Sequence, residues 1–490
     1  MEFVRIGNVL MLAGSAFAAA SCSTKQVAPK TPNVVFILAD DLGWGDLGCY
    51  GQQRFTTPNI DALANNGIRF TQCYSGTTVS APSRSCLVTG THSGHTAVRG
   101  NMELEPEGQF PLPEGAETIF HDLKAAGYRT GAFGKWGLGG VGSTGDPYAQ
   151  GIDTFFGFNC QLLAHSYYPD HLWDNDQKVI LEDNVDAVPY GQGTYASDLI
   201  HAKAIEFLEE ASSGDKPFFL WYPTTIPHAE LIVPEDSIIQ KYRGAFPENP
   251  YKGVDSGPAF RHGGYVSQEY PHATFAAMVS RLDMYVGQIV DKLKELGVYD
   301  NTVIVFASDN GPHKEGGADP DFFDSNGPWR GYKRDVYEGG IRVPMIVSWP
   351  GQLAQGKETD FMCSFWDMMP TLRDLTGVAS VEGLDGVSLL PLLKGKKGQK
   401  EHDYLYFEFQ ELGGRQAVRK GPWKLVRMKV RQDDSYFELY NLDEDPGETT
   451  DVSASFPEKV TELRIIMDEA HVPNPDFPLL KEEWEVSKND

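Results

Sequence analysis

The chain has 490 residues and a formal net charge of −26, and 41% of its residues are hydrophobic. This length exceeds what one ordinary core requires, so we expect a large domain and a smaller one. The acidic balance argues against a nucleic-acid partner and against a long polyanion lying across the whole surface, but it allows a small anion in a locally basic pocket.

The N-terminus has the pattern of an export signal. Arg5 precedes an apolar run over residues 6–20, which is too short to span a bilayer comfortably. The run ends in AASC at residues 19–22, which resembles a bacterial lipobox with Ala19 in place of the commoner leucine. Lipidation of Cys22, simple cleavage, and a retained buried segment are the alternatives. We expect an exported protein that is periplasmic or anchored by lipid to a bacterial membrane.

Five cysteines follow Cys22, and their spacing is uninformative. Their odd number gives no disulfide framework, and the absence of a CxxC pair argues against a zinc site. They are Cys49, Cys73, Cys86, Cys160 and Cys363.

Short apolar runs alternate with helical patterns through most of the chain, which indicates a largely parallel sheet covered on both faces. Residues 33–39 (NVVFILA) are typical of a buried central strand. Similar runs occur at 216–222, 302–307 and 343–348. Apolar residues then recur at helical spacing from Met278 to Leu296, and Gly297 offers a stop, so we expect a covering helix there.

After about residue 395 the pattern changes to short antiparallel strands separated by Gly, Pro and Asp turns. The strand patterns lie at 404–410, 418–428 and 436–442, and an amphipathic helix is expected over 457–470. In chain order we therefore expect a signal peptide (1–22), a tether (23–31), a catalytic domain (32–395) and a C-terminal subdomain (396–490).

Polar residues directly follow four of the expected strands. Asp40-Asp41 follow the first strand, Asp309-Asn310 follow the strand at 302–307, Pro227-His228 follow the run that begins at 216, and Gly134-Lys135 end the weaker YRTGAF pattern. Ligand sites of open parallel sheets lie beyond the carboxyl ends of the strands. The four segments should therefore deliver their side chains to one edge.

Asp40, Asp41, Asp309 and Asn310 offer only hard oxygen atoms. Carboxylates so close together repel one another unless a cation lies between them. Oxygen ligation favours Ca²⁺, or less strongly Mg²⁺, over zinc or copper. Aspartates also cap turns, so either pair alone would be a weak signal.

The most specific pattern is SAPSRSCLVTG at residues 80–90, which resembles the signature of the type I, formylglycine-dependent sulfatases, including bacterial arylsulfatase-like enzymes. The resemblance covers most of residues 32–450. It extends to DDLGWGDLGCYG (40–51), FGKWGLGG (133–140), SDNGPH (308–313), GYKRDVYEGGIRVP (331–344) and FELYNLDEDPGE (437–448). It implies an α/β fold related to alkaline phosphatase, a sandwich with a large, mostly parallel central sheet and a small C-terminal α+β subdomain that has an antiparallel sheet.

The resemblance implies that a serine-type maturating enzyme oxidises Ser80 to formylglycine (3-oxoalanine) and that residue 80 joins the metal ligands. An ordinary serine would be left as a stable sulfate ester, whereas a hydrated aldehyde carries two hydroxyls, one to attack sulfur and one to expel sulfate. Ser80 also fits a helix cap, with Pro82 in the first turn, and the two interpretations are compatible.

The same resemblance assigns roles to four further residues. Arg84 holds residue 80 and the metal ligands, Lys135 and Lys333 neutralise sulfate oxygens, and His228 protonates the leaving alcohol. Isolated lysines and histidines are usually ordinary surface or core residues, so these roles depend on the motif positions.

One position departs from the family pattern. The family often has GKWHxG, but Gly137 stands where that histidine would help deprotonate the hydrated aldehyde. His313 and His165 are the candidates to replace it or to bind substrate. His165 is followed by Tyr167, Tyr168 and Trp173, which could stack on a sugar ring, or it could be a structural loop histidine.

These patterns predict hydrolysis of a sulfated carbohydrate by exo-action on a terminal, singly sulfated residue. Residues 311–335 resemble enzymes acting on 4-sulfated galactose or N-acetylgalactosamine. Two alternatives remain at this stage: a phosphatase or phosphodiesterase of the same superfamily that uses Ser80 directly, and a disabled, lipid-anchored glycan-binding protein.

Overall fold

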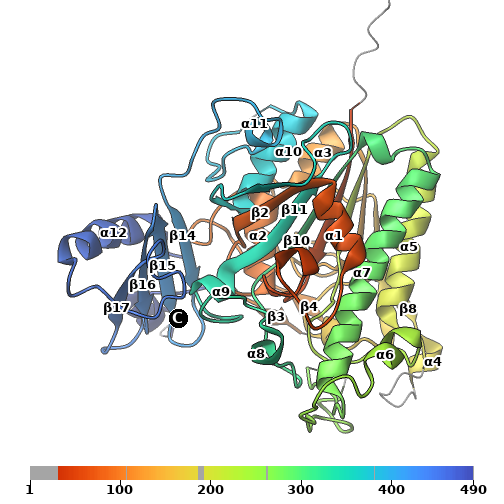
Figure 1. Cartoon of the computed structure of the whole chain (residues 1–490), viewed down its shortest axis with the longest axis horizontal. Coiled ribbons are helices and arrows are strands. Elements are labelled where there is room, and N and C mark those ends of the chain that lie inside the picture. The colour runs from red at the N-terminus through yellow and green to blue at the C-terminus, as the bar shows by residue number, and fades with distance from the viewer. Residues whose placement is uncertain (1–30, 106, 186–192, 261–262, 380, 489–490) are drawn as a thin grey trace, which may run out of the picture. The chain divides into compact units, whose positions relative to one another are not determined.

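The computed structural model describes residues 31–105, 107–185, 193–260, 263–379 and 381–488 (Figure 1). The expected signal peptide, the possible lipidation site at Cys22 and almost all of the tether lie outside these residues. Among the described residues, no helix combines the length and the apolar character needed to cross a membrane.

A large sheet dominates residues 32–364. Its strands follow the order β12–β2–β11–β10–β1–β9–β5–β6–β7–β8, with β13 pairing β2. Their bounds are β1 Asn33–Ala39, β2 Gly67–Tyr74, β5 Arg129–Lys135, β6 Thr154–Phe158, β7 His171–Asp174, β8 Gln177–Ile180, β9 Phe218–Pro223, β10 Thr302–Ser308, β11 Arg342–Ser348, β12 Lys357–Thr359 and β13 Cys363–Ser364. A small hairpin pairs β3 (Glu103–Leu104) with β4 (Gly108–Gln109).

The central strands run parallel, as the sequence predicts. β1 pairs in parallel with β10 and β9, and β5 pairs in parallel with β9 and β6. β11 is different, because it runs antiparallel to both β10 and β2, although residues 343–348 have the same apolar character as the parallel strands. An apolar run shows that a strand is buried on both faces and says nothing of its direction.

Helices cover both faces of this sheet. The helices before residue 395 are α1 Pro58–Asn65, α2 Ser80–Thr89, α3 Ile119–Ala125, α4 Glu182–Val185, α5 Ala196–Ser212, α6 Ser237–Tyr242, α7 Pro271–Glu295, α8 Pro320–Phe323, α9 Glu338–Ile341, α10 Met368–Thr376 and α11 Leu390–Leu393. Val35 and Ile37 of β1 pack into a core with α1, α5 and α7, whereas Val34 and Phe36 pack into a second core with α2, α3 and α10. Successive β1 side chains enter one core and then the other, which explains why every residue of this strand is buried.

The long covering helix predicted near residues 278–296 is α7, which begins earlier, at Pro271. Figure 1 shows it beside α5 on one face of the sheet. Gly297 follows its C-cap Leu296 with φ +68°, a left-handed conformation that glycine adopts without strain.

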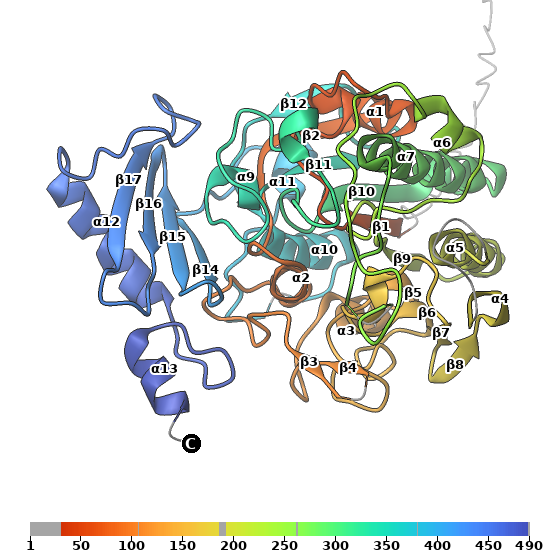
Figure 2. The same cartoon turned by 90° about the horizontal axis from the view of Figure 1, so that it is seen from below.

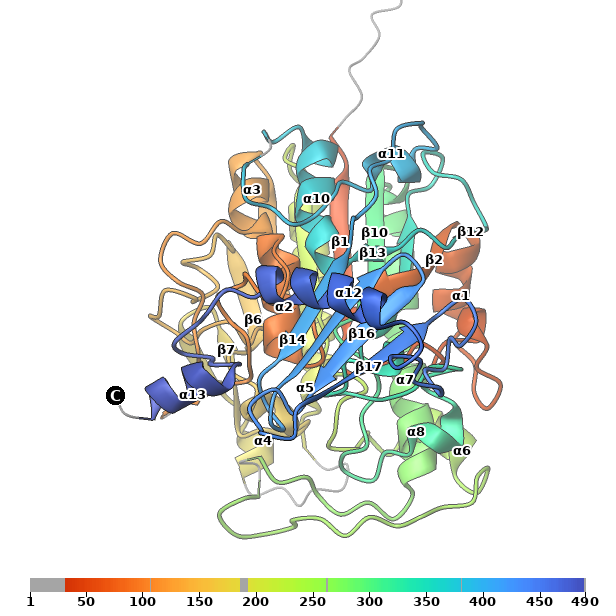
Figure 3. The same ribbon diagram turned by 90° about the vertical axis from the view of Figure 1, so that its left-hand side faces the viewer.

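The C-terminal residues form a separate antiparallel sheet in the order β14–β15–β16–β17. Its strands are β14 Leu405–Phe409, β15 Arg415–Lys420, β16 Trp423–Met428 and β17 Tyr436–Asn441. The pattern at 418–428 thus contains two strands and a tight turn. Helix α12 (Pro457–Ala470) lies across one face of this sheet, and α13 (Lys481–Ser487) follows it (Figures 2 and 3).

Candidate active site

Ser80 is the first residue of α2 and points away from the helix axis. Its Oγ donates to Oδ1 of Asp40 at 2.9 Å and accepts from Nζ of Lys135 at 3.5 Å. The expectation that Ser80 caps the helix is wrong, because Val79 is the N-cap residue and makes no side-chain cap bond. The Ser80 hydroxyl is therefore held by charged groups at the end of β1 and β5.

Arg84 lies one helical turn after Ser80 and connects three of the predicted segments. Its Nε and Nη2 donate to Oδ2 of Asp309 at 3.1 and 2.9 Å, and its Nη1 donates to the carbonyl oxygen of Lys135. Nη2 also lies 3.4 Å from Oδ2 of Asp40. This guanidinium is 1% exposed, so it fixes the ends of β1, β5 and β10 from inside the core.

The four predicted oxygen donors converge as the strand order requires. Asp40, Asp41, Asp309 and Asn310 are all fully buried. The backbone N–H of Asp41 donates to Oδ1 of Asp309 at 3.1 Å, and Nδ2 of Asn310 donates to Oδ1 of Asp41 at 2.6 Å. Asp41 has φ +62°, a left-handed conformation that is uncommon outside glycine and frequent at functional sites.

Two observations fit a cation among these residues. Oδ1 of Asn310 is buried and has no hydrogen-bond partner in the described part of the chain. Burial, followed by the charge of Asp40, raises the pKa of Asp309 to about 7, which is the penalty expected for neighbouring buried carboxylates. An all-oxygen donor set suits Ca²⁺ or Mg²⁺, so the residues present fit the metal that the sequence predicts.

Lys135 and Lys333 flank the site from opposite sides. Nζ of Lys135 donates to Oδ2 of Asp40 at 2.7 Å. Nζ of Lys333 donates to Oδ2 of Asp41 at 2.8 Å, to Nε2 of His228 at 2.9 Å and to Oε2 of Glu315 at 3.2 Å. Both ammonium groups are buried and paired with carboxylates, so each could donate hydrogen bonds to a small anion in the site.

His228 is oriented by its backbone. Its Nδ1 donates to the carbonyl oxygen of Ala229, which leaves the lone pair of Nε2 to accept from Lys333. Burial, followed by the charge of Lys333, holds the pKa of His228 well below its usual value. The proton beside the site therefore lies on the Lys333 ammonium, in direct contact with the imidazole.

His165 and His313 both stack on His228. The ring centroids lie 5.0 Å from His228 for His165 and 5.7 Å for His313. Nε2 of His313 donates to the carbonyl oxygen of Pro227, and its Nδ1 accepts from the N–H of Glu315, so backbone groups engage both nitrogens. His165 retains a buried Nδ1 without a hydrogen-bond partner among the described residues, which makes it the better candidate of the two for contact with a ligand.

The space near Gly137 is filled by a residue that sequence reasoning missed. Gly137 has φ +71°, and a Cβ placed on it would lie 2.3 Å from Nε2 of Gln161. Gln161 is 3% exposed, and its Nε2 has no partner in the described chain. Glu315, which contacts Lys333, was also missed. Its position two residues after His313, in the loop that follows the metal motif, was the available signal.

The expected aromatic wall for a sugar is wrong for two of its three members. Tyr167 and Tyr168 are 0% and 2% exposed, so neither presents a face to a ligand. The Tyr167 hydroxyl instead donates to the carbonyl oxygens of Thr225 and His228, and its ring stacks on Tyr195. Tyr167 therefore supports the His228 loop from within the core.

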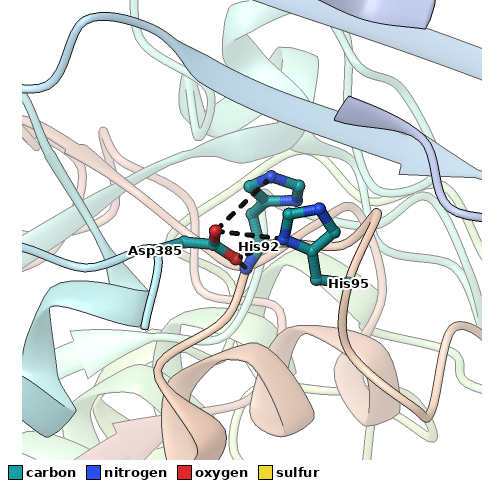
Figure 4. A group of neighbouring side chains, drawn as sticks. All are labelled: His92, His95 and Asp385. Carbon is teal, nitrogen blue, oxygen red and sulfur yellow. Dashed lines mark hydrogen bonds and ion pairs between the residues drawn. The ribbon is translucent and has the colours of Figure 1, made fainter. Parts of the chain in front are cut away.

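A second group of ionisable side chains lies beyond the C-terminal end of α2 (Figure 4). Nδ1 of His95 lies 2.9 Å from Oδ2 of Asp385, and the His92 backbone N–H donates to the same oxygen. Nδ1 of His92 accepts from the Gly94 N–H, so a neutral His92 carries its proton on Nε2, where a metal would need a lone pair. This geometry fits a set of hydrogen bonds that joins the segment after α2 to the loop containing Asp385, and it does not suit a metal site.

The five cysteines named above are free thiols in this structure. Burial raises the pKa of several of them, Cys86 and Cys363 included, which makes them poor nucleophiles.

Comparison with known proteins identifies the family. The model for the family described as Sulfatase matches residues 32–378, and one described as N-sulphoglucosamine sulphohydrolase, C-terminal, matches residues 327–469. Human arylsulfatase A is 33% identical over 422 residues, covering 81% of this chain and 74% of that protein. The N-acetylglucosamine-6-O-sulfatase of Bacteroides thetaiotaomicron is 26% identical over 542 residues, covering 94% and 90%.

Solved structures share the fold of this chain. Ps i-CgsB in complex with k-i-k-neocarrahexaose superposes with a TM-score of 0.76 at 27% identity and covers 94% of this chain and 98% of that one. A phosphonate monoester hydrolase of Agrobacterium radiobacter, at 21% identity and a TM-score of 0.62, shares the fold.

At the carboxyl edge of an alkaline-phosphatase-like sheet, a serine at the start of a helix meets buried lysines, an arginine and clustered carboxylates, an arrangement suited to the class of hydrolases that act on anionic esters. Within that class, the chain belongs to the sulfatase family. It is a sulfuric ester hydrolase, which confirms the family, the fold class and the enzyme class that the sequence predicts.

Proposed function

We propose that this enzyme removes sulfate from a terminal, singly sulfated sugar, using a nucleophile made from Ser80. The observation that carries the proposal is the convergence on one buried site of every residue to which the sequence motifs assign chemistry. They are Ser80, Arg84, Lys135, His228, Lys333, Asp40, Asp41, Asp309 and Asn310.

In this proposal, Asp40, Asp41, Asp309, Asn310 and residue 80 hold a calcium ion. The metal would neutralise the carboxylates and polarise an oxygen of the bound sulfate. The orphaned Oδ1 of Asn310 and the clustered carboxylates support this assignment. Their oxygen chemistry favours calcium, with magnesium less suitable.

Formylglycine at position 80 would supply two hydroxyls on one carbon, one for attack on sulfur and one for release of sulfate. The chain's own residues position that side chain. Asp40 accepts from the Oγ of residue 80, and Arg84 holds Asp309 and the Lys135 carbonyl around it. A serine-type maturating enzyme is the partner that this modification requires.

The two lysines stabilise negative charge on the transferring group. Lys135 lies on the Ser80 side and Lys333 on the His228 side, so a sulfate between them would meet an ammonium at either end. His228 and Lys333 share one hydrogen bond beside the position of the leaving oxygen. We assign proton delivery to the leaving alcohol to this pair, whose shared proton lies on the Lys333 ammonium while Nε2 of His228 accepts from it.

The names of relatives support a sugar substrate. The Bacteroides relative is an N-acetylglucosamine-6-O-sulfatase, and a rat relative, 29% identical over 479 residues, is an N-acetylgalactosamine-6-sulfatase. The acidic balance supports exo-action, because a chain charged −26 repels polysulfated polymers outside the site that holds Arg84, Lys135 and Lys333. The phosphatase alternative calls for additional histidine and aspartate zinc ligands, which the motifs of this chain do not supply.

The N-terminal pattern supports export, with lipidation of Cys22 and attachment to a bacterial membrane as the more specific proposal. If this proposal is right, the protein fractionates with membranes until detergent releases it, and the Cys22→Ala variant no longer fractionates with membranes.

The test of function is a substrate panel with matured enzyme. The panel contains 4-sulfated galactose, 4- and 6-sulfated N-acetylgalactosamine, 6-sulfated N-acetylglucosamine, a long polysulfated chain and 4-nitrophenyl phosphate. We expect kcat/KM to be highest for a sulfated monosaccharide and to be abolished in Ser80→Ala. Faster cleavage of internal sulfates in the polymer would contradict exo-action, and preferential phosphate release would favour the phosphatase alternative.

A further inference from the structure

Glu315 lies at the open side of the site and contacts two successive cations. Its Oε2 accepts from Nζ of Lys333 at 3.2 Å and from the hydroxyl of Tyr265 at 3.1 Å, and its Oε1 accepts from Nη1 of Arg334. Oε2 is also 4.0 Å from Nε2 of His228. Because His228 and Lys333 mark the leaving-group side, Glu315 borders the space that the alcohol part of a substrate would occupy.

Arg334 is held in a strained conformation beside it. Its φ is +76°, which is uncommon for a residue other than glycine. Its N–H donates to the carbonyl oxygen of Thr78 at 3.0 Å, and its own carbonyl accepts from Nη1 of Arg415 at 2.6 Å. Such strain persists where the surroundings enforce it, often at functional sites. The consequence here is that Lys333 points inward while Arg334, next in the chain, points outward.

Both side chains of the Glu315–Arg334 pair reach solvent. The side chain of Arg334 is 35% exposed and that of Glu315 is 19% exposed, whereas Lys333 is 3% exposed. The pair therefore borders the mouth of the site, and the lysine lies within it.

The chemistry of the pair matches a hydroxyl and disfavours a second sulfate. A carboxylate only accepts hydrogen bonds, a guanidinium only donates them, and a sugar hydroxyl does both. Glu315 balances Arg334 in an ion pair, so this pair leaves no excess positive charge for another anion. A sulfate next to the scissile ester would place negative charge against Glu315.

We infer that Glu315 and Arg334 determine specificity by binding a free hydroxyl next to the sulfate ester, with Glu315 accepting from that hydroxyl and Arg334 donating to it. The substrate class is then a sugar whose carbon next to the sulfated one carries an unmodified hydroxyl. This inference rests on the proposed function.

The test compares ratios of kcat/KM between matched substrates. The probes are a hexose monosulfate with a free neighbouring hydroxyl, its analogue deoxygenated at that position, its analogue sulfated at that position, and 4-nitrophenyl sulfate. The variants are Glu315→Gln and Arg334→Asn, since asparagine tolerates a left-handed backbone better than most residues. Asp321→Asn is the control, because Asp321 is 63% exposed and pairs with Lys314 instead.

We expect the wild-type enzyme and the control to prefer the free hydroxyl over the deoxy analogue by about ten- to a hundredfold, as for a hydrogen bond to a charged group. The disulfated analogue should be a poor substrate. Both variants should weaken this preference, Glu315→Gln because a neutral amide oxygen accepts less strongly than a carboxylate, whatever their rate on 4-nitrophenyl sulfate.

Two results would overturn the inference alone: a wild-type enzyme that treats the three sugars alike, or variants that lose rate on every substrate in the same proportion. The second result would mean that the pair only holds Lys333 in place. A wild-type enzyme that hydrolyses 4-nitrophenyl sulfate but no sulfated sugar would overturn the proposed function itself, and the inference with it.

Discussion

Replacing Gly137 with alanine tests whether Gln161 occupies the space of a side chain at this position. A residue with a Cβ at φ +71° costs about 1–2 kcal/mol relative to glycine. The new Cβ would lie 2.3 Å from Nε2 of Gln161. Because that atom ends a flexible side chain, we place the overpacking cost near the lower limit, about 1 kcal/mol. Gly137→Ala should therefore destabilise the fold by about 2–3 kcal/mol.

A double-mutant cycle separates the two contributions. In a Gln161→Ala background the clash is gone, so Gly137→Ala should cost about 1 kcal/mol less than in the wild type. The assay is denaturant-induced unfolding of the four proteins, and Gly140→Ala is the control. Gly140 lies in the same loop, has no positive φ, and would place its Cβ no closer than 3.5 Å to another atom. An equal cost in both backgrounds would refute the assignment of this space to Gln161.

Further outcomes follow from the metal site and from the small sheet. Chelation should abolish activity and lower the midpoint of thermal unfolding. Calcium at a hundred times its Kd should restore activity and about 2.7 kcal/mol of the free energy of unfolding. Restoration by zinc alone would favour the phosphatase alternative. Nζ of Lys424 is buried between Glu338 and Glu448 at 2.9 and 2.8 Å. Lys424→Met would leave the buried carboxylates without this cation, so it should destabilise the fold by about 3–5 kcal/mol in denaturant titrations. An unchanged unfolding midpoint would contradict this. Burial raises the pKa of Glu448 from 4.5 to about 7, so the folded chain holds a proton that the unfolded chain releases in that range. The contribution of Glu448 to stability is therefore full below pH 4.5 and lost as the pH rises through 7, and Glu448→Gln should flatten this slope in unfolding measured across pH.

The sequence predicted the central part of the site because chain order and sheet geometry are linked there. Asp40, Lys135, His228 and Asp309 each directly follow a strand pattern, and the corresponding strands β1, β5, β9 and β10 are parallel neighbours. Such strands end at the same edge, so strand assignment was enough to place Asp40, Lys135 and Asp309 together, whereas the loop after β9, which ends at Pro223, places His228.

The residues that sequence reasoning missed or misplaced depend on loop packing. The role of Gln161 could not be predicted, because it depends on a contact with Gly137, 24 positions earlier, that no local sequence pattern encodes. Tyr167 has the composition of a sugar-stacking residue, but burial against Tyr195 makes it part of the core. The antiparallel direction of β11 could not be predicted either, since an apolar run is compatible with both strand directions.

The central claim is that Ser80 becomes the nucleophile, and one measurement tests it most directly. Protein produced with and without a serine-type maturating enzyme is digested, and the peptide containing Ser80 is weighed by mass spectrometry while turnover of a sulfated monosaccharide is recorded. The account predicts a loss of about two mass units at Ser80 and activity proportional to the converted fraction. Full activity in unconverted protein, or in Ser80→Ala, would contradict it.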